Sequence, residues 1–363
     1  MTRAPRLRVA VVFGGRSTEH AISCVSAGSV LAVLDRERYD VVPIGITPDG
    51  RWVLAADDPT RLAISDRRLP AVDPTGTALV LPGDPTAKGL VVLDAHDAPP
   101  DLGAVDVVFP LLHGPYGEDG TLQGLLELAG VPYVGSGVFA SAAAMDKHHM
   151  KQLLQVVGLR VPDYVVVRRG DSAPLDVEAL GLPLFVKPAR GGSSIGITRV
   201  DDLAQLESAL AEAHRHDPKA LVERAVHGRE VECGVLADAD GRPQASVPAE
   251  IRVTGAHPFY DFEAKYLEDS TEFDIPPDLP DATVVKVQAA AVQAFEALDC
   301  EGLARVDFFV TDDGDVLVNE LNTMPGFTPS SMFPRMWAAT GVSYPQLVDR
   351  LLQDAVRRGS GLR

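Results

Sequence analysis

The sequence predicts an α/β and α+β protein of two or three compact units, and three observations support this. With 363 residues, of which 46% are hydrophobic, the chain can bury a large core. Its first third alternates strand-like and helix-like stretches, which favours a parallel sheet with helices on its faces. From Pro162 onward, short strands separated by turn residues become frequent, which indicates a second, α+β part.

The elements of the first third follow from their hydrophobic patterns. Apolar runs predict strands and amphipathic runs predict helices. In chain order we expect a strand at 7–13, a helix at 19–34, strands at 39–46 and 105–114, and a helix at 120–130. Between them, residues 48–100 are rich in Pro, Asp and Gly around short strands, which predicts a hairpin excursion. A helical stretch at 137–159 then leads out of this part.

The rest of the chain predicts more strands and two long helices. The expected strands lie at 164–169, 184–187, 197–200, 220–226, 229–237, 303–310 and 315–321, and the helices at 201–216 and 283–300. A Gly-, Pro- and Asp-rich loop at 255–280 separates these elements. Long loops inside compact domains are usually lids or disordered segments, so this loop is a candidate lid.

Composition excludes several classes of protein. The net charge of -18 argues against a nucleic-acid surface, because phosphate backbones are held by clustered Lys and Arg. Cys24, Cys233 and Cys300 lie far apart, which indicates reduced cytosolic thiols, with neither a disulfide framework nor a zinc site. The N-terminal apolar run is short and charged residues soon follow, so we interpret it as a strand, not a signal peptide. No window has the apolar length that spans a bilayer.

The segment DVLVNELNTMPGFTPSS predicts a site for a hard cation. Glu320 and Asn322 occupy alternate positions at a strand end and therefore point to the same face. A DDGD turn joins this strand to ARVDFFV, a hairpin signal that brings Asp307 near them. Two carboxylates and an amide suit Mg²⁺. Alone, Asp307 is more simply explained as a solvated turn acid; the three together favour a metal site.

A second pattern, KPARGGSSIG, is typical of a loop that wraps phosphate oxygens. Glycines allow close backbone approach, and Lys187 ends an apolar strand where a cation is otherwise unexpected. A Gly/Ser loop alone is more often a plain hairpin. The phosphate loop GxxxxGK[ST] does not occur in the sequence.

Two further loops follow predicted parallel strands, at the edge where such sheets bind ligands. In FGGRSTEHAIS, Glu19 lies in the first turn of a helix, where it either compensates the helix dipole or serves as an ammonium counter-ion. In LLHGPYGEDGTLQG, His113 and Glu118 are either catalytic or turn residues, and the many glycines favour a ligand-facing loop.

Taken together, these stretches resemble the D-alanine-D-alanine ligases of the ATP-grasp superfamily. The matching motifs, in the family's order, are GGRSTEHAIS, LHGPYGEDGTLQG, MDKHHMK, KPARGGSSIG, VERAVHGREVE, EAKY, ARVDFF and NELNTMPGFTPSS. The resemblance implies the ATP-grasp fold with an N-terminal Rossmann-like (preATP-grasp) domain at 1–137. A central subdomain at 138–226 and a C-terminal subdomain at 227–363, with the lid loop 255–280, would follow.

The resemblance also implies a nucleotide site. The positions that match nucleotide-binding residues are Lys147, Lys187, Ser193, Glu223, Arg224, Val226, Glu230 and Lys265. Lys147 and Lys187 match phosphate contacts, and the loop with Ser193 would close over the nucleotide. Glu223 and Val226 fall where the family meets the adenine edge. Arg224 stands where the family often has Lys, which keeps the charge and changes hydrogen-bond geometry.

Metal and amino-acid sites follow in the same way. Asp307, Glu320 and Asn322 match the ligands of two Mg²⁺ ions, with Mn²⁺ as a substitute. Positions that match catalytic or substrate-binding groups are Glu19, His113, Ser193, Tyr266, Arg305, Gly326, Ser331 and Met332. Glu19 would hold the ammonium of the first D-alanine, and Ser331 and Met332 lie beside the carboxylate of the second.

The implied reaction is ATP-dependent ligation of two D-alanine molecules through an acyl phosphate, for peptidoglycan precursors. Arg305 and the Gly326 N–H match groups that stabilise the reacting carboxyl. Two candidates stay open for the group that removes the amine proton, namely His113 and a Ser193–Tyr266 relay. Lys265 and Tyr266 form the lid tip, which would exclude water from the acyl phosphate.

Three alternatives to this reaction are weighed against the motifs. The same fold can join D-alanine to D-lactate or D-serine, although the EAKY motif favours D-alanine as acceptor. Another ATP-grasp carboxylate-amine ligase is disfavoured by Glu19 and HGPYGEDG. A non-catalytic nucleotide-binding protein is disfavoured by the intact metal-ligand positions. The resemblance further implies a cytoplasmic homodimer that binds ATP and D-alanine, with neither nucleic acid nor membrane as a partner.

Overall fold

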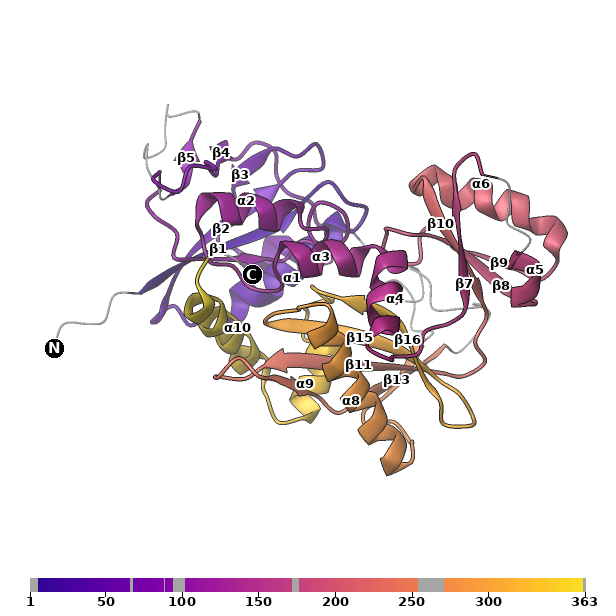
Figure 1. The fold of residues 1–363 in the computed structure, drawn as a ribbon. Coiled ribbons are helices and arrows are strands. Elements are labelled where there is room, and N and C mark those ends of the chain that lie inside the picture. The colour runs from indigo at the N-terminus through magenta and orange to yellow at the C-terminus, as the bar shows by residue number, and fades with distance from the viewer. Residues whose placement is uncertain are drawn as a thin grey trace.

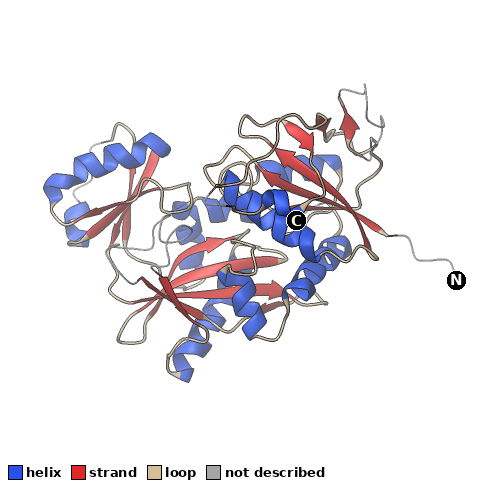
Figure 2. Ribbon diagram, turned by 180° about the vertical axis from the view of Figure 1, so that it is seen from behind, coloured by secondary structure: helices blue, strands red, loops and turns tan. Residues whose placement is uncertain are grey.

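The computed structural model describes residues 6–65, 68–87, 89–93, 102–171, 176–253 and 271–361. Three main sheets follow one another along the chain, and helices cover them (Figures 1 and 2). The second sheet and its helices form a lobe that stands apart from the other two sheets (Figure 1). In the described ranges, no helix is long and apolar enough to cross a membrane.

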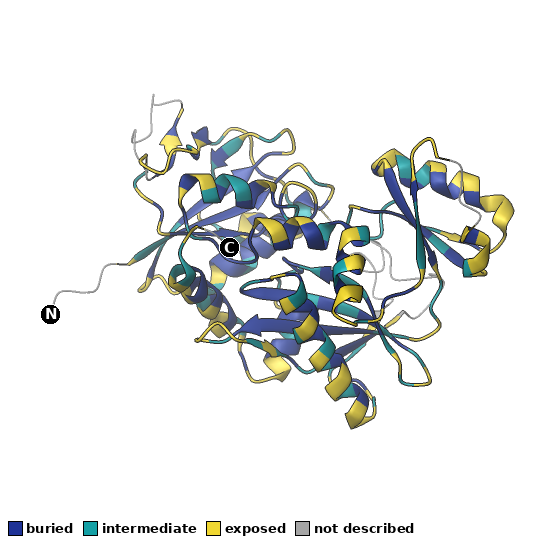
Figure 3. Cartoon of the chain, viewed as in Figure 1, coloured by how far each residue is buried: buried dark blue, intermediate teal, exposed yellow. Residues whose placement is uncertain are grey.

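The first sheet has the predicted parallel core. Its strand order is β3 (Trp52–Leu54), β2 (Tyr39–Ile46), β1 (Leu7–Gly14) and β6 (Val107–Pro110), with β1 parallel to β2 and β6. Alternate residues of β1 enter two hydrophobic clusters, Val9 with Phe13 in one and Ala10 with Val12 in the other. Both faces of the sheet are therefore covered, as parallel sheets require, and its strands are mostly buried (Figure 3).

Helices and short elements complete this part of the chain. They are α1 (His20–Val33), the 3-10 turn Pro59–Leu62, α2 (Thr121–Ala129) and α3 (Val138–Met145), with the two-stranded pair β4 (Leu79–Val80) and β5 (Val91–Val92). The helix predicted at 137–159 is two helices. The Asp146 carboxylate caps a new one, α4 (Lys147–Val156), by accepting the N–H groups of His148 at 3.2 Å and His149 at 3.3 Å.

The second sheet is antiparallel, in the order β7 (Tyr164–Arg168), β10 (Lys219–Arg224), β8 (Leu184–Pro188) and β9 (Thr198–Val200). One face of this sheet packs on α6 (Leu206–His216), which follows the short turn Leu203–Gln205. The sheet also contacts α5 (Asp176–Leu180). Leu184 and Val186 point into this core, so the alternating Phe185 and Lys187 face the opposite side. The strand period thus places a lysine on the cavity side of the sheet.

The third sheet is also antiparallel. Its order is β14 (Thr271–Asp274), β13 (Ala249–Val253), β11 (Arg229–Ala237), β15 (Leu303–Val310) and β16 (Val316–Asn322), with β12 (Pro243–Ala245) paired to β11. Helix α8 (Asp281–Ala297) covers one face, and Val287 and Phe295 share a core with Val306 and Phe308. The helix and hairpin predicted from the sequence are confirmed here.

The last two helices return to the first sheet. Helix α9 (Met332–Ala339) and α10 (Tyr344–Arg358) place Phe333, Leu347 and Leu351 in the same hydrophobic cluster as Val9 and Phe109. The core of the N-terminal sheet therefore contains the end of the chain. The domain limits 1–137, 138–226 and 227–363 stay predictions.

Candidate active site

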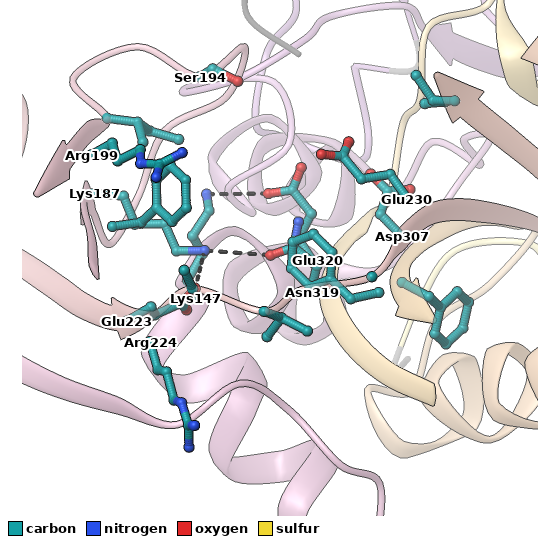
Figure 4. A pocket seen from close by; sticks show the side chains of 18 of the residues that line it. Lys147, Lys187, Ser194, Arg199, Glu223, Arg224, Glu230, Asp307, Asn319 and Glu320 are labelled. Carbon is teal, nitrogen blue, oxygen red and sulfur yellow. Dashed lines mark hydrogen bonds and ion pairs between the residues drawn. The ribbon is translucent and has the colours of Figure 1, made fainter. Parts of the chain in front are cut away.

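A cavity of about 300 Å³ lies between the second and third sheets (Figure 4). Strands β8 and β10 supply one wall, strands β11, β15 and β16 supply the other, and the connection 225–228 also lines the cavity. The lining includes the predicted residues Lys147, Lys187, Ser193, Glu223, Arg224, Val226, Glu230, Asp307 and Glu320. Residues that lie up to 173 positions apart in the sequence thus meet in one place, since the numbering runs from 147 to 320.

The wall from the second sheet carries a buried charge pair. Lys187 Nζ lies 2.6 Å from Glu223 Oε2 and 3.4 Å from Asn319 Oδ1 (Figure 4). Glu223 is 4% exposed and Lys187 is 6% exposed. Burial would raise the pKa of Glu223, but the ammonium groups of Lys151 and Lys187 outweigh it and hold this pKa below its usual range.

The opposite wall brings two predicted metal ligands together. Asp307 on β15 is the register partner of Glu320 on β16. Next to this pair the register shifts, so that Phe308 pairs with Val318 and Asn319 is the extra residue of a β-bulge. The bulge lets Asn319 and Glu320 line the cavity together, whereas a regular strand would point them to opposite faces.

Asn322 joins this group from the end of β16. Its Nδ2 donates to Asp307 Oδ2 at 3.1 Å. A smaller cavity of about 30 Å³ is lined by Glu320 and Asn322 together with Lys147. Asp307 and Glu320 therefore line the large cavity, Asn322 lines the smaller cavity beside Glu320, and the oxygen donors of the three residues fit a magnesium ion.

Arg305 is partly buried beside the metal-ligand positions, with 16% of its side chain exposed. Its Nε and Nη2 donate to the two oxygens of Asp307, both at 2.7 Å, and Nε also lies 3.1 Å from Glu232 Oε2. Burial alone would lower the pKa of Arg305, but Asp307 and Glu232 raise it well above its ordinary value. The guanidinium therefore stays charged and is fixed in orientation by two carboxylates.

Lys147 lies at the first turn of α4. Its Nζ donates to the Gly191 carbonyl at 2.7 Å and lies 3.5 Å from Glu320 Oε2 (Figure 4). The loop 189–196 thus reaches the metal-ligand end of the cavity. Ser193 and Ser194 both have left-handed backbone conformations, with φ of 51° and 58°, which are uncommon for residues other than glycine. Strain of this kind is often found where a loop meets a ligand.

Glu19 connects the first part of the chain to this loop. Ser193 Oγ donates to Glu19 Oε1 at 2.5 Å. Glu19 is the N-cap residue of α1 and is 8% exposed, and its side chain makes no cap hydrogen bond. Its carboxylate also lies against Gly114 and Gly192, where a Cβ atom would come within 2.6 Å and 2.9 Å of Oε2. Glu19 therefore lies at the helix start and faces the loop 189–196, and its role as an ammonium counter-ion stays a prediction.

His113 and Glu118 hold the neighbouring loop in place. His113 Nδ1 lies 3.0 Å from the Met324 carbonyl and its Nε2 lies 3.1 Å from Ser26 Oγ. Since a carbonyl only accepts, Nδ1 carries the proton and Nε2 accepts from the serine. Burial lowers the pKa of His113, which agrees with a neutral ring. Glu118 accepts the N–H groups of Gly114 at 2.7 Å and Met324 at 2.9 Å.

The segment after β16 carries the remaining predicted substrate residues. Ser331 Oγ accepts the Thr328 N–H at 3.1 Å, and a Cβ atom on Gly326 would lie 3.1 Å from this oxygen. Ser331 and Gly326 are therefore neighbours. Met332 is 7% exposed and packs in a small hydrophobic cluster with Met336 and Ile251.

The positions that the resemblance assigns to the nucleobase and to the lid differ in what the structure shows. Arg224, Val226 and Glu230 all line the cavity, and the Arg224 side chain is 62% exposed and lies 4.0 Å from Asp163. Lys265 and Tyr266, at the tip of the predicted lid 255–280, lie outside the described residues. Their roles stay predictions.

Three residues of the site were missed from the sequence. Lys151 contacts Glu223, Glu232 contacts Arg305, and Asn319 contacts Lys187. Two of them had a usable signal. Lys151 lies four positions after Lys147 on a helix and Glu232 lies two positions after Glu230 on a strand, so each shares a face with a predicted residue.

The arrangement suits the transfer of an anionic group. Ammonium groups of Lys147 and Lys187 lie on one side, and a carboxylate cluster suited to a divalent cation lies on the other. The ammonium groups, together with a divalent cation held by the carboxylates, would neutralise a polyphosphate chain and hold it in line with an acceptor. Glu19 adds a buried carboxylate at the side of the loop 189–196.

Comparisons with known proteins agree with this chemistry. Two family models match, D-ala D-ala ligase N-terminus over residues 8–136 and D-ala D-ala ligase C-terminus over residues 153–353. The D-alanine-D-alanine ligase of Nocardia farcinica is 62% identical over 363 residues, covering 99% of each chain.

Solved structures give the same fold. The D-Ala:D-Ser ligase VanG from Enterococcus faecalis is 35% identical with a TM-score of 0.83, covering 97% of this chain and 100% of that one. The D-alanine-D-alanine ligase of Bacillus anthracis, complexed with ATP, is 28% identical with a TM-score of 0.72, covering 97% and 98%. The predicted ATP-grasp fold is confirmed, and the chain belongs to the D-alanine-D-alanine ligase family.

Proposed function

We propose that this chain joins two D-alanine molecules to D-alanyl-D-alanine with the conversion of ATP to ADP and phosphate, for peptidoglycan precursor synthesis. The observation that carries the proposal is the cavity between two antiparallel sheets. There the ammonium groups of Lys147 and Lys187 face the carboxylates of Asp307 and Glu320. Relatives about 60% identical over their full length are named D-alanine-D-alanine ligase, which supports the same substrates.

The first step forms an activated acyl group. The carboxylate oxygen of the first D-alanine attacks the γ-phosphorus of ATP, the bond to the β-phosphate oxygen breaks, and ADP leaves. Lys147 and Lys187 reduce the negative charge on the phosphate oxygens during this transfer. Glu19, which is buried and oriented by Ser193, holds the ammonium of the same D-alanine.

A metal site fits the residues present. Asp307, Glu320 and Asn322 would supply carboxylate and amide oxygens, which are the donors that Mg²⁺ prefers. Two Mg²⁺ ions, or Mn²⁺ in their place, would neutralise charge on the transferring phosphoryl group. Arg305 keeps the Asp307 carboxylate oriented through two hydrogen bonds of 2.7 Å.

The second step forms the peptide bond. The amine nitrogen of the second D-alanine attacks the acyl carbon, the carbon–oxygen bond to phosphate breaks, and inorganic phosphate leaves. Arg305 and the Gly326 N–H stabilise the negative charge that develops on the acyl oxygen. Ser331 and Met332 lie beside the carboxylate of the second D-alanine.

We further propose that Ser193, together with Tyr266, relays the proton that the amine loses. His113 is disfavoured because both of its ring nitrogens already have partners and its ring is neutral with the proton on Nδ1. The Ser193 hydroxyl donates to Glu19, so it can accept a proton from the amine while it passes its own to that carboxylate.

A coupled assay of ADP formation tests the proposal. The purified chain is incubated with Mg-ATP and D-alanine, L-alanine, or D-alanine mixed with D-serine or D-lactate, and the products are identified by mass. We expect ADP and D-alanyl-D-alanine with D-alanine, and little turnover with L-alanine. If D-serine or D-lactate outcompetes D-alanine as acceptor, the acceptor assignment is wrong. Absence of ADP formation in every mixture contradicts the proposed function.

The remaining expectations concern assembly and location. We propose a homodimer in the cytoplasm, supported by the family resemblance. Light scattering on the eluting protein measures the mass of the assembly, and a value near that of the 38.6 kDa single chain would contradict a dimer.

A further inference from the structure

Lys151 is a buried lysine that the proposed reaction does not use. It lies on α4, four residues after Lys147, and so on the same face of the helix. Its side chain is 0% exposed. Among the residues that the structure describes as lining the cavity, Lys147, Lys187 and Glu223 occur and Lys151 does not. Lys151 therefore lies behind the cavity wall and reaches a ligand only through another residue.

That other residue is Glu223. Lys151 Nζ lies 2.9 Å from Glu223 Oε1, while Lys187 Nζ lies 2.6 Å from the second oxygen, Oε2. Each oxygen of one carboxylate thus has its own ammonium partner, one from α4 and one from β8. The two lysines differ in access, because Lys187 lines the cavity and also contacts Asn319 at 3.4 Å, whereas Lys151 is enclosed.

Burying an ammonium group costs free energy of desolvation, so a buried lysine at this place needs a physical reason. Burial lowers the pKa of Lys151 to about 8, and Glu223 opposes this shift while Lys187 and Lys147 add to it. The face of the Tyr164 ring lies 5.8 Å from Nζ and gives weak additional stabilisation. The group as a whole has two ammonium groups for one carboxylate, which leaves positive charge at the cavity wall.

We propose that Lys151 is a positioning residue for the nucleotide, acting through Glu223. It is the fixed partner that keeps the Glu223 carboxylate in place at the position that the resemblance assigns to the adenine edge. Lys187 can then leave this carboxylate for a phosphate group. The inference rests on the proposed function, since it takes the ligand to be ATP. Without Lys151, Glu223 would retain Lys187, and the phosphate would lose its partner.

The same geometry gives a preference for the base. A carboxylate at this place accepts a hydrogen bond from the exocyclic amine of adenine, whereas guanine presents a carbonyl oxygen there, which a carboxylate repels. The preference for adenine depends on a carboxylate that is charged and correctly oriented. Loss of Lys151 therefore reduces both nucleotide affinity and base discrimination.

The test measures binding of Mg-ADP and Mg-GDP by calorimetry, which needs no turnover. The proteins are the full-length wild type, Lys151→Met, Glu223→Gln and the double variant. We expect Lys151→Met to weaken Mg-ADP binding by at least about 10-fold. We also expect it to bring the affinities for Mg-ADP and Mg-GDP closer together, so that their quotient, the ADP-to-GDP ratio, moves toward one. In the Glu223→Gln background the same change adds less than about 2-fold, because the two residues act as a unit.

A matched control is Lys219→Met. Lys219 is another buried lysine, 5% exposed, and its ion-pair partner is Asp146, not Glu223. Its loss lowers the melting temperature, as loss of any buried ion pair does, and leaves the ADP-to-GDP ratio unchanged. This variant separates general destabilisation from an effect on the discrimination between adenine and guanine nucleotides.

Each outcome decides for or against the inference. Independent, multiplicative effects of the two changes, or a Lys151→Met protein that keeps its base preference and loses only stability, would overturn it. If Lys151→Met does not fold, the double variant decides: the inference expects it to fold and bind Mg-ADP as Glu223→Gln does, and an unfolded double variant overturns it. Failure of the wild type to bind Mg-ADP overturns the proposed function itself, which is a separate result.

Discussion

We expect Gly192→Ala to displace the Glu19 carboxylate without unfolding the chain. An ideal Cβ atom on Gly192 would lie 2.9 Å from Glu19 Oε2, whereas ordinary contacts begin at 3.4 Å, so Oε2 must retreat by about 0.5 Å. Gly114 lies against the same oxygen and blocks retreat on that side. Because a displacement of 1 Å at a reacting group costs about 100-fold, we expect about a 10-fold loss in kcat/KM for D-alanine.

Stability is expected to change little. Gly192 does not have a positive φ, so alanine is compatible with its backbone, and the atom that must move is the end of a flexible side chain. Replacing glycine by alanine at a compatible position stabilises a protein by about 0.4–1 kcal/mol through the unfolded state. The melting temperature should therefore stay the same or rise slightly.

The neighbouring glycine provides a matched control. A Cβ atom on Gly191 meets nothing within 4 Å, and its φ is likewise not positive. Coupled ADP release is measured against D-alanine at saturating Mg-ATP, and then against Mg-ATP at saturating D-alanine. We expect Gly192→Ala to raise the KM for D-alanine and to leave that for ATP nearly unchanged, and Gly191→Ala to match the wild type. Equal behaviour of the two variants would refute the reasoning.

Three further predictions concern the metal, the thiols and a buried acid. Asp307→Asn removes a carboxylate from the predicted magnesium site, so we expect at least about a 100-fold loss of kcat and a higher Mg²⁺ requirement in the ADP assay; unchanged Mg²⁺ dependence contradicts the assignment. Burial raises the pKa of Cys24, Cys233 and Cys300 to about 12, so these thiols stay protonated at pH 8 and should react with a disulfide reagent only after denaturation; rapid labelling of the native chain would disprove this. Burial, followed by the charge of Glu19, raises the pKa of Glu118 to about 8 from 4.5, so the folded chain keeps a proton that the unfolded chain releases, and stability falls as pH rises through this window. Glu118→Gln should flatten this fall by roughly 3 kcal/mol between pH 5 and pH 8 in urea unfolding, and parallel profiles would show the shift to be absent.

Local patterns in the sequence predicted most elements of the fold. Helix α1 is predicted at 19–34 and runs from His20 to Val33, so the prediction is correct to within one residue at each end. The break at Asp146 was missed because the alanine-rich run before it and the apolar residues after it both favour helix. The capping ability of Asp146 decides the break, and the bound N–H groups of His148 and His149 show it.

Predicted site residues come together where adjacent strands of one sheet place them on the same wall of the cavity. Lys187 and Glu223 are adjacent because β8 and β10 pair and their alternate residues share a face. Nothing local in the sequence predicted the bulge at Asn319, since a bulge depends on how β16 fits β15. The burial of Lys151 cannot be predicted from the sequence for a similar reason. A lysine on a helix usually lies in solvent, and only the ion pair between Lys151 on α4 and Glu223 on β10 reveals its partner.

The return of the last two helices to the first sheet has a consequence for synthesis. Strand β1 is made first, yet Val9 and Phe13 share their core with Leu347 and Leu351, which are made last. While the ribosome is still translating, one apolar side of the earliest strands therefore lacks its final cover. A nascent chain that stops before α10 should be aggregation-prone and readily degraded, and the N-terminal segment expressed by itself should not form a stable unit.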